Sequence, residues 1–226
     1  MNAVVLLSGG FDSVAALYWA KQNKAYSSVL ACMFDYGQPN RDQELSIAGT
    51  IALELGVERI CLVVADSLPR GAGILRSVED DDGREDGVSP AFVPGRNLVF
   101  LTCAAAHAAV RFKNGPIALV IGANGTDARR FPDCHVGAFA KLAEALRHGV
   151  GREIVIASPW IDRTKEQVLS SLDDTGRALV ARSWSCYRGK GPCGRCSACV
   201  LRAAAFQACG MADACKPTVM FGGDPR

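Results

Sequence analysis

Six consecutive residues near the start of the chain, Ser8 to Ser13, combine glycines and polar side chains suited to binding a phosphate; they read Ser-Gly-Gly-Phe-Asp-Ser. An apolar run precedes them and a helical pattern follows. A strand, a glycine turn and a helix in that order point backbone N–H groups at an anion. Gly9 and Gly10 let the backbone approach the anion closely. Because the carboxylate of Asp12 repels phosphate, its presence favours a Mg²⁺ ion that bridges to the phosphates.

This loop differs from two better-known phosphate-binding turns. The lysine of a Walker A loop is missing after the second glycine, and the spacing is not that of the Gly-x-Gly-x-x-Gly dinucleotide turn. The loop resembles the Ser-Gly-Gly-x-Asp-Ser signature of the ATP-pyrophosphatase family, whose members split ATP between its α- and β-phosphates and adenylate a substrate. The resemblance implies that ATP is bound by Ser8, Gly9, Gly10, Phe11, Asp12 and Ser13. An ordinary glycine turn is the alternative, and the full set of polar positions argues against it.

Four cysteines late in the chain form a second group suited to chemistry. Cys186, Cys193, Cys196 and Cys199 follow the spacing Cys-x6-Cys-x2-Cys-x2-Cys, with glycines and a proline between them. Four thiolates suit a tetrahedral structural Zn²⁺ ion. An iron–sulfur cluster is the main alternative, because Cys-x2-Cys-x2-Cys also occurs in bacterial ferredoxins. Buried cysteines without a metal are the third interpretation.

The composition predicts a soluble globular protein of the cytoplasm. The chain has 226 residues, 49% of them hydrophobic, and a formal net charge of +2. This length suits one well-buried α/β domain with a small appendage. The small net charge does not indicate a basic nucleic-acid surface, and no apolar run is long enough to cross a bilayer. No signal peptide is recognisable, so the ten cysteines favour metal binding in a reducing compartment over disulfides.

Strand and helix patterns alternate along the chain. The apolar runs that predict strands span residues 4–7, 28–34, 58–64, 117–121 and 154–157. Helical patterns span residues 14–20, 41–55, 98–112, 139–146, 164–172 and 198–208. Continuous apolar strands are typical of a parallel sheet covered on both faces, so we predict a doubly wound, mostly parallel five-stranded α/β sheet. We expect residues 1–182 to form this ATP-pyrophosphatase domain and residues 183–226 to form a small zinc-binding helical segment packed on it.

The polar loops of the predicted sheet gather at one edge. The glycine loop (Ser8 to Ser13), residues 35–38 and residues 122–127 each follow a predicted strand. In an open α/β sheet, ligands bind in the crevice outside the carboxyl ends of the strands, so these loops indicate a single site. Residues 67–91, rich in glycine and acidic side chains, break the pattern. A solvated loop and a lid near the site are the two interpretations of that segment.

Further motifs make the chain similar to one family. Beyond the glycine loop, the matching segments are Asp35-Tyr36-Gly37-Gln38 with Glu44, Val93 to Asn97, Gly122-Ala123-Asn124 with Asp127, Pro132-Asp133-Cys134, Lys165, Ser183 to Tyr187, and Cys193 to Cys199 with Arg202. They lie in order over nearly the whole chain and resemble the QueC family of 7-cyano-7-deazaguanine synthases in queuosine biosynthesis. The tryptophan-containing and cysteine segments are more specific than the glycine loop, which many adenylating enzymes share.

The resemblance implies an adenine nucleotide alpha hydrolase-like fold and an ATP-dependent carbon–nitrogen ligase. Such an enzyme converts 7-carboxy-7-deazaguanine and ammonia to the nitrile preQ0 through an activated carboxylate and an amide. The expected cofactors are Zn²⁺, and Mg²⁺ with ATP; we also expect a homodimer and no nucleic-acid or membrane partner. The implied catalytic residues are Asp12 and Lys165, which a protein that only binds a nucleotide would not need together.

The implied binding residues for the acceptor lie in loops at the predicted crevice: Tyr36, Gln38, Arg96, Asn97, Asp127 and Asp133. We expect Arg96 to pair with the carboxylate of the substrate. The carboxylates of Asp127 and Asp133 are suited to accept hydrogen bonds from the amino group and the ring N–H of a purine-like base.

Three segments near these loops depart from the family pattern. Ala128 to Phe131 replaces a segment of the Ser-Gly-Tyr type, His135 replaces an arginine, and Pro39-Asn40 replaces an Arg-His pair. These differences leave open a QueC-like enzyme with another acceptor. Two more distant functions also stay open. One is a tRNA-thiolating enzyme, which would need an iron–sulfur cluster and a basic RNA surface, and the second is a non-catalytic nucleotide-binding zinc module.

Overall fold

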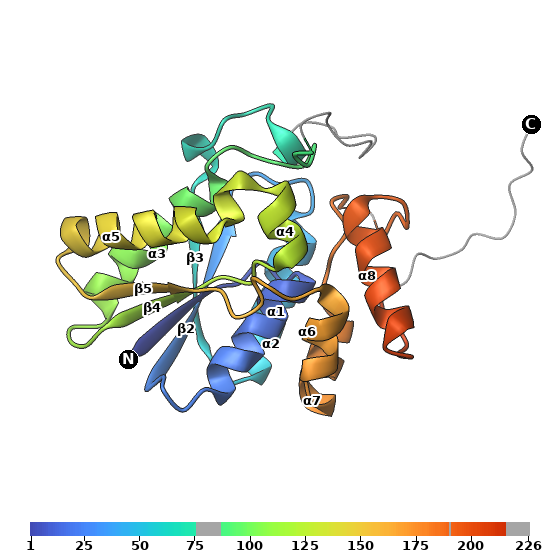
Figure 1. Cartoon of the computed structure of the whole chain (residues 1–226), viewed down its shortest axis with the longest axis horizontal. Helices are drawn as coiled ribbons and strands as arrows, with labels where there is room; N and C mark the ends of the chain where they lie inside the picture. The colour runs from blue at the N-terminus through green and yellow to red at the C-terminus, as the bar shows by residue number, and fades with distance from the viewer. Residues whose placement is uncertain (76–86, 190, 216–226) are drawn as a thin grey trace, which may run out of the picture.

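The computed structural model describes residues 1–75, 87–189 and 191–215, and its centre is a five-stranded sheet (Figure 1). The strands are β1 (Asn2–Leu6), β2 (Ser28–Asp35), β3 (Glu58–Val63), β4 (Ile117–Val120) and β5 (Ile154–Ala157). Their order is β3-β2-β1-β4-β5, and each neighbouring pair in this sheet is parallel. The predicted doubly wound parallel sheet is therefore confirmed.

Helices cover both faces of the sheet (Figure 1). One face carries α1 (Phe11–Gln22), α2 (Arg41–Glu54), α6 (Lys165–Ser171) and α7 (Asp174–Ala181), and the other carries α3 (Arg96–Arg111) and α5 (Val136–Val150). The short α4 (Gly125–Arg130) follows β4, and α8 (Ser197–Ala208) packs against α6. Short 3-10 turns are formed by Ala65–Ser67, Gly73–Leu75 and Pro132–Cys134. From β1 the chain adds β2 and β3 on one side of the sheet, and it then adds β4 and β5 on the other side of β1. Such a reversal of strand order creates a ligand-binding crevice between β1 and β4.

The central strand is apolar along its length because both of its faces are covered. Val4 and Val5 of β1 are fully buried and belong to separate apolar clusters on opposite faces of the sheet. Leu17 of α1 lies in the cluster with Val5, and Leu101 of α3 lies in the cluster with Val4. Successive side chains of a strand point to opposite faces, so a strand that is covered on both faces needs an unbroken apolar run.

Two glycines allow backbone segments to touch at the carboxyl edge of the sheet. Gly9 has a φ of +78°, and a Cβ atom there would lie 2.6 Å from the carbonyl oxygen of Glu44 in α2. A Cβ atom at Gly122 would lie 2.6 Å from the backbone of Asp12. A larger residue at either position would push the glycine loop away from α2 or from the segment that follows β4.

The structure contains two helices that the sequence patterns did not predict. Asp173 caps α7 by accepting a hydrogen bond from the backbone N–H of Gly176. A capping box between Asn124 and Asp127 holds α4. The six residues of α4 include one apolar side chain, and α7 begins with Asp-Thr-Gly-Arg, so their polar caps were the better signal.

No helix in the described part of the chain is long and apolar enough to span a lipid bilayer.

The sequence patterns left residues 67–91 as either a solvated loop or a lid. The acidic centre of that segment, residues 76–86, lies outside the described residues.

The C-terminal segment shares its core with the sheet domain. Phe206 of α8 is 1% exposed and meets Phe11 edge to face, with ring centroids 6.0 Å apart. The buried guanidinium of Arg202 donates hydrogen bonds to Asp213 at 2.8 Å and to the carbonyl oxygen of Ser183 at 3.0 Å. An apolar contact and a buried ion pair therefore fix the segment in place. A division of the chain at residue 182 stays a prediction.

Arg202→Gln is expected to lower the free energy of unfolding by about 3–5 kcal/mol, because it leaves the carboxylate of Asp213 buried without its cation. Urea unfolding followed by circular dichroism measures the loss. Arg182→Gln is the matched control: this arginine pairs with Glu54 at 2.8 Å on the surface, where an ion pair contributes less than about 1 kcal/mol. Equal losses in the two variants would contradict the role assigned to Arg202.

Candidate functional site

A cavity of about 250 Å³ opens at the carboxyl edge of the sheet, beside the ends of β1 and β4. The predicted site residues that line it are Ser8, Gly10, Phe11, Asp12, Ser13, Tyr36, Arg96, Asn97, Asp127 and Lys165. Three more predicted residues, Gly9, Gln38 and Asp133, are not part of its lining as far as the described residues extend. Residues from the start of the chain and from α6 thus meet at one place, as a single crevice requires.

The glycine loop is held by its own serine hydroxyls. Ser13 Oγ accepts a hydrogen bond from the backbone N–H of Ser8 at 3.2 Å and donates one to the carbonyl oxygen of Gly10 at 3.0 Å. Ser8 Oγ accepts a hydrogen bond from the backbone N–H of Gly10 at 3.2 Å. The first turn of α1 lines the cavity, and its N-cap residue, Gly10, provides no side-chain cap. A helix start of this kind suits a phosphate group.

Asp12 has a cation partner within the chain. Lys165 Nζ forms an ion pair with Asp12 Oδ2, and Asn124 Nδ2 donates a hydrogen bond to Asp12 Oδ1 at 3.0 Å. The side chains of Lys165 and Asp12 are 14% and 18% exposed, so the pair is largely shielded from water. The sequence argument inferred a Mg²⁺ ion as the positive partner of Asp12. In the structure, Lys165 is a positive partner of this carboxylate.

Asp127 is a second carboxylate in this charged cluster. Burial raises the pKa of Asp127 to about 6; the negative charge of Asp12 acts in the same direction, and Lys165 opposes both. Asp127 Oδ2 also accepts a hydrogen bond from the backbone N–H of Asn124 at 3.2 Å. Carboxylate oxygens beside a phosphate-binding loop are the donor set that a magnesium ion bound with a nucleotide prefers, so these residues fit that ion.

Another part of the cavity wall is aromatic and carries Arg96. Phe34 and Phe100 stack with ring centroids 4.1 Å apart, and Tyr36 meets Phe100 edge to face at 5.2 Å. Arg96 Nη1 lies 3.5 Å from the hydroxyl oxygen of Tyr36, and the guanidinium carbon lies 5.8 Å from the centre of the Tyr36 ring. Flat apolar surfaces beside a cation suit a planar ligand with polar edges.

Glu44 of α2 also lines the cavity, and sequence reasoning did not place it among the binding residues. Its Oε2 accepts a hydrogen bond from Gln38 Nε2 and its Oε1 accepts one from Asn40 Nδ2, both at 3.0 Å. Burial raises the pKa of Glu44 to about 7, although both amides and the charge of Arg96 favour the ionised form. A signal was present in the sequence, because Glu44 falls in the first turn of a helix that directly follows the polar loop 35–38.

Two predicted binding residues support the cavity without lining it. Gln38 is 4% exposed, and its amide also donates a hydrogen bond to the carbonyl oxygen of Phe34 at 3.2 Å. Asp133 is 5% exposed, and its Oδ2 accepts a hydrogen bond from the backbone N–H of Asn97 at 2.9 Å. These contacts position Glu44 and the first turn of α3, so the expectation that Gln38 and Asp133 touch a ligand has no support in this geometry.

Asp133→Ala is expected to lower the free energy of unfolding by about 1–3 kcal/mol, because it leaves the backbone N–H of Asn97 buried without an acceptor. Urea unfolding measures the change. Asp42→Ala is the control, because this carboxylate is 83% exposed and pairs only with the partly exposed Arg41 among the described residues; its replacement should leave the midpoint unchanged. An unchanged midpoint in Asp133→Ala would contradict the structural role of Asp133.

The segments that depart from the family pattern take defined places in the structure. Asn40 Nδ2 bridges to the carbonyl oxygen of Cys186 at 3.0 Å in addition to Glu44. His135 caps α5, its Nδ1 accepting a hydrogen bond from the backbone N–H of Gly137 at 3.1 Å. Arg130 and Phe131 both line the cavity. The changes at Asn40 and His135 are thus accommodated by structural contacts, whereas Arg130 reaches the site.

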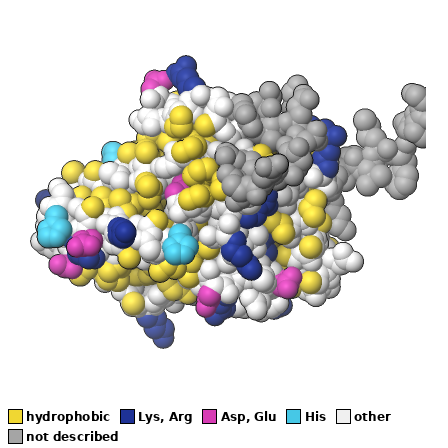
Figure 2. All heavy atoms as spheres, turned by 45° about the horizontal axis from the view of Figure 1, so that its top comes forward, with side chains coloured by type: hydrophobic (Ala, Val, Ile, Leu, Met, Phe, Trp, Pro, Cys, Tyr) yellow, Lys and Arg dark blue, Asp and Glu magenta, His cyan; other side chains and the backbone are white. Residues whose placement is uncertain are grey.

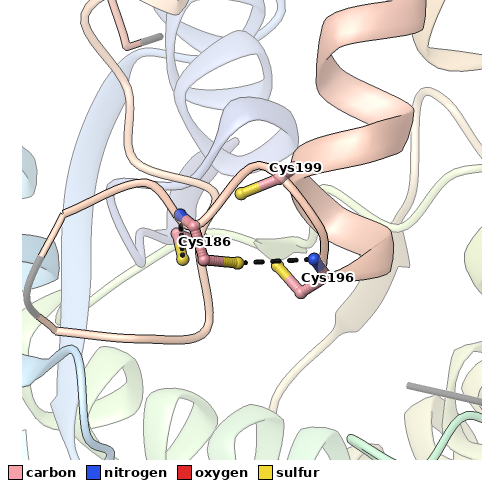
Figure 3. Close-up of side chains that lie close together, drawn as sticks. Cys186, Cys196 and Cys199 are labelled. Atoms are coloured by element: carbon pink, nitrogen blue, oxygen red, sulfur yellow. Dashed lines mark hydrogen bonds between the residues drawn. The ribbon is translucent and has the colours of Figure 1, made fainter. Parts of the chain in front are cut away.

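The four cysteines of the C-terminal segment converge on one point. Figure 3 shows the sulfur atoms of Cys186, Cys196 and Cys199 turned toward one another, and with Cys193 the four sulfurs lie within 4.8 Å of each other. The backbone N–H groups of Arg188 and Cys193 donate hydrogen bonds to Cys186 Sγ at 3.3 and 3.4 Å. Such contacts stabilise thiolates. One tetrahedral ion can be reached by all four sulfurs, so the cluster could hold a metal ion.

Trp184 connects this cysteine cluster to the glycine loop. Its backbone N–H donates a hydrogen bond to the carbonyl oxygen of Gly9 at 2.9 Å, and its indole Nε1 donates one to the carbonyl oxygen of Cys186 at 2.7 Å. Trp184, Ser185 and Tyr187 all line the cavity. The geometry of the cysteine cluster and the shape of the cavity are therefore coupled.

The surface charge is mixed. On the face shown in Figure 2, basic, acidic and apolar side chains are interspersed. This pattern agrees with the formal net charge of +2.

Comparison with known proteins adds independent findings. The model of the family described as "Queuosine biosynthesis protein QueC" matches residues 2–210. The chain is 40% identical over 219 residues to the 7-cyano-7-deazaguanine synthase of Chromobacterium violaceum, covering 94% of this chain and 92% of that protein. It is 37% identical over 218 residues to the 7-cyano-7-deazaguanine synthase of Laribacter hongkongensis, covering 94% and 93%.

One solved structure with a similar outline is the U34-tRNA thiolase NcsA from Methanococcus maripaludis with its 4Fe-4S cluster. It aligns with a TM-score of 0.42 and 16% identity, covering 99% of this chain and 76% of that chain. A likeness at this TM-score carries no argument about function.

Proposed function

The chain belongs to the QueC family, and from this premise we propose that it is an ATP-dependent carbon–nitrogen ligase, a 7-cyano-7-deazaguanine synthase. It converts 7-carboxy-7-deazaguanine and ammonia to 7-cyano-7-deazaguanine (preQ0) in queuosine biosynthesis. The observation that carries the proposal is one cavity in which a phosphate-binding loop and a charged cluster meet an aromatic wall. The named relatives favour this activity over tRNA thiolation and over a non-catalytic nucleotide-binding module.

The chemistry explains why ATP is needed. A carboxylate is a poor electrophile because its leaving group would be oxide. Attack of the substrate carboxylate on the α-phosphate of ATP forms an acyl adenylate and releases pyrophosphate. Ammonia then displaces AMP to give the amide. A second ATP activates the amide oxygen in the same way, and loss of AMP and a proton gives the nitrile. The protein contributes mainly positioning and electrostatic stabilisation.

The glycine loop and the charged cluster beside it hold the nucleotide. The N–H groups at the start of α1 bind phosphate oxygens. Lys165 stabilises the negative charge that develops on the reacting phosphate. Asp12 orients Lys165 and, together with Asp127, offers carboxylate oxygens to a magnesium ion. That ion, when bound with ATP, neutralises phosphate charge.

The aromatic wall holds the acceptor. The planar ring of the deazaguanine acid packs against Tyr36 and Phe100, where burial of flat apolar surface favours binding. Arg96 and Asn97 supply polar contacts to the ring and its substituents. Gln38 and Asp133 act as positioning residues, the first through Glu44 and the second through the start of α3.

We assign zinc to the four cysteines, since a site of four thiolates with no open position is typical of structural zinc. All ten cysteines lie in the described part of the chain, and none of them forms a disulfide there, a state that suits the reducing cytoplasm. The homodimer expected from the sequence stays a prediction.

A coupled assay of pyrophosphate release tests the proposed function. Steady release of pyrophosphate is expected only when ATP, 7-carboxy-7-deazaguanine and an ammonium salt are all present, because each turnover consumes all three compounds. Omission of ammonium should stop release after the first adenylation. Steady release with unmodified tRNA and a sulfide donor in place of the acid would support thiolation and contradict the proposal.

A further inference from the structure

The proposed function leaves one carboxylate of the cavity without a role. Glu44, Arg96 and Tyr36 all line the cavity, and the charges of Glu44 and Arg96 act on each other. Each of its two oxygens accepts one amide hydrogen bond at 3.0 Å, from Gln38 and from Asn40. These bonds fix the plane of the carboxylate, and each oxygen keeps further lone-pair capacity for a ligand. Glu44 is therefore a preorganised pair of acceptors in the wall of the cavity.

We propose that Glu44 and Arg96 together recognise the amide edge of the deazaguanine base. The Glu44 carboxylate accepts hydrogen bonds from N1–H and from the 2-amino group, and Arg96 donates to the O6 oxygen. This inference rests on the proposed function and deepens it. This edge of the base presents one acceptor, O6, followed by two donors, N1–H and the 2-amino group. A guanidinium that donates and a carboxylate that accepts provide the complementary groups in the same order.

The surroundings of Glu44 strengthen such hydrogen bonds. The stacked rings of Phe34 and Phe100 are buried and line the same cavity, and hydrogen bonds are electrostatically stronger in an apolar, low-dielectric environment. Burial raises the pKa of Glu44 to about 7. Two N–H donors from a ligand would favour the ionised form in the same way as the two amides and Arg96 already do.

This arrangement changes the role expected for Arg96 from the sequence, which was to pair with the substrate carboxylate. The carboxyl group is attached to the five-membered ring, on a different side of the base from N1 and the 2-amino group. With Glu44 holding the amide edge, the carboxyl group is free to point toward the glycine loop. There it meets the α-phosphate of ATP and the ammonium of Lys165.

The test compares two acids in steady-state kinetics, 7-carboxy-7-deazaguanine and its analogue without the 2-amino group. The unmodified protein is expected to use the analogue about 10- to 100-fold less efficiently in kcat/KM, because one donor to Glu44 is missing. In Glu44→Gln this preference should fall to within about threefold, because a carboxamide cannot accept from both donors. KM for ATP should stay unchanged in the variant.

Asp42→Asn is the matched control, since this exposed carboxylate lies on the same helix two residues away; it should keep the full preference. Equal use of both acids by the unmodified protein would overturn the inference whether or not any variant folds. An undiminished preference in Glu44→Gln would also overturn it. If that variant does not fold, Glu44→Asp is measured instead, and there too an unchanged preference would contradict the role of Glu44. Failure of the unmodified protein to use either acid would refute the proposed function itself, a result distinct from equal use.

Discussion

Asp12→Asn is expected to lower kcat by about 10³-fold while leaving the fold intact, on the scale seen when one preorganised charge contact to a transition state is lost. The substitution keeps the shape of the side chain, so the hydrogen bond from Asn124 has an acceptor. It removes the negative partner of Lys165 and one carboxylate of the charged cluster. Steady-state pyrophosphate release over a magnesium titration measures the loss, and thermal melting checks the fold.

Glu166→Gln is the control for this experiment. Glu166 directly follows Lys165 in sequence, but its side chain is exposed. Its replacement is expected to leave kcat within about twofold, as surface changes away from a site usually do. Activity of Asp12→Asn close to that of the unmodified protein at any magnesium concentration would show that Asp12 is not needed for the reaction.

Cys196→Ser is expected to lose the bound metal and to lower the free energy of unfolding by on the order of 5 kcal/mol, because the binding energy of a structural zinc ion is also folding energy. Activity should fall too, since Trp184 joins the cysteine cluster to the glycine loop. Elemental analysis should find one zinc ion per chain in the unmodified protein and less in the variant. Thermal melting reports the loss of stability.

Cys61→Ser is the matched control, because Cys61 is an exposed thiol on β3. It should keep the metal and the melting temperature. Iron with labile sulfide and a brown chromophore in the unmodified protein would refute the zinc assignment. Retention of the full metal content by Cys196→Ser would refute the ligand set.

The fold was largely predictable from the sequence because its strands and glycine turns carry strong local signals. Val4 and Val5 are buried on opposite faces of β1, and such double burial requires the continuous apolar run that predicted a parallel sheet. The glycine loop was predictable because its Ser-Gly-Gly-Phe-Asp-Ser pattern is local, and the left-handed φ of Gly9 shows why a glycine is needed there. The short helices α4 and α7 were missed because they depend on caps from Asn124 and Asp173 more than on apolar periodicity.

The site was only partly predictable because side-chain direction depends on long-range contacts. The family resemblance, together with loop position for Asp133, suggested that Asp133 and Gln38 face a ligand. In the structure the carboxylate of Asp133 instead accepts a hydrogen bond from the start of α3, and Gln38 holds Glu44. The pairing of Asp12 with Lys165 joins residues far apart in sequence, and no spacing rule predicts such a contact.

Mass spectrometry of the reaction product tests the proposed activity most directly. The unmodified protein is incubated with ATP, 7-carboxy-7-deazaguanine and isotopically labelled ammonium, and the molecular mass of the purified product is measured. We predict 7-cyano-7-deazaguanine that carries one labelled nitrogen, formed together with AMP and pyrophosphate. Recovery of the unchanged acid under conditions where the protein binds ATP would contradict the assignment of this acid as the acceptor.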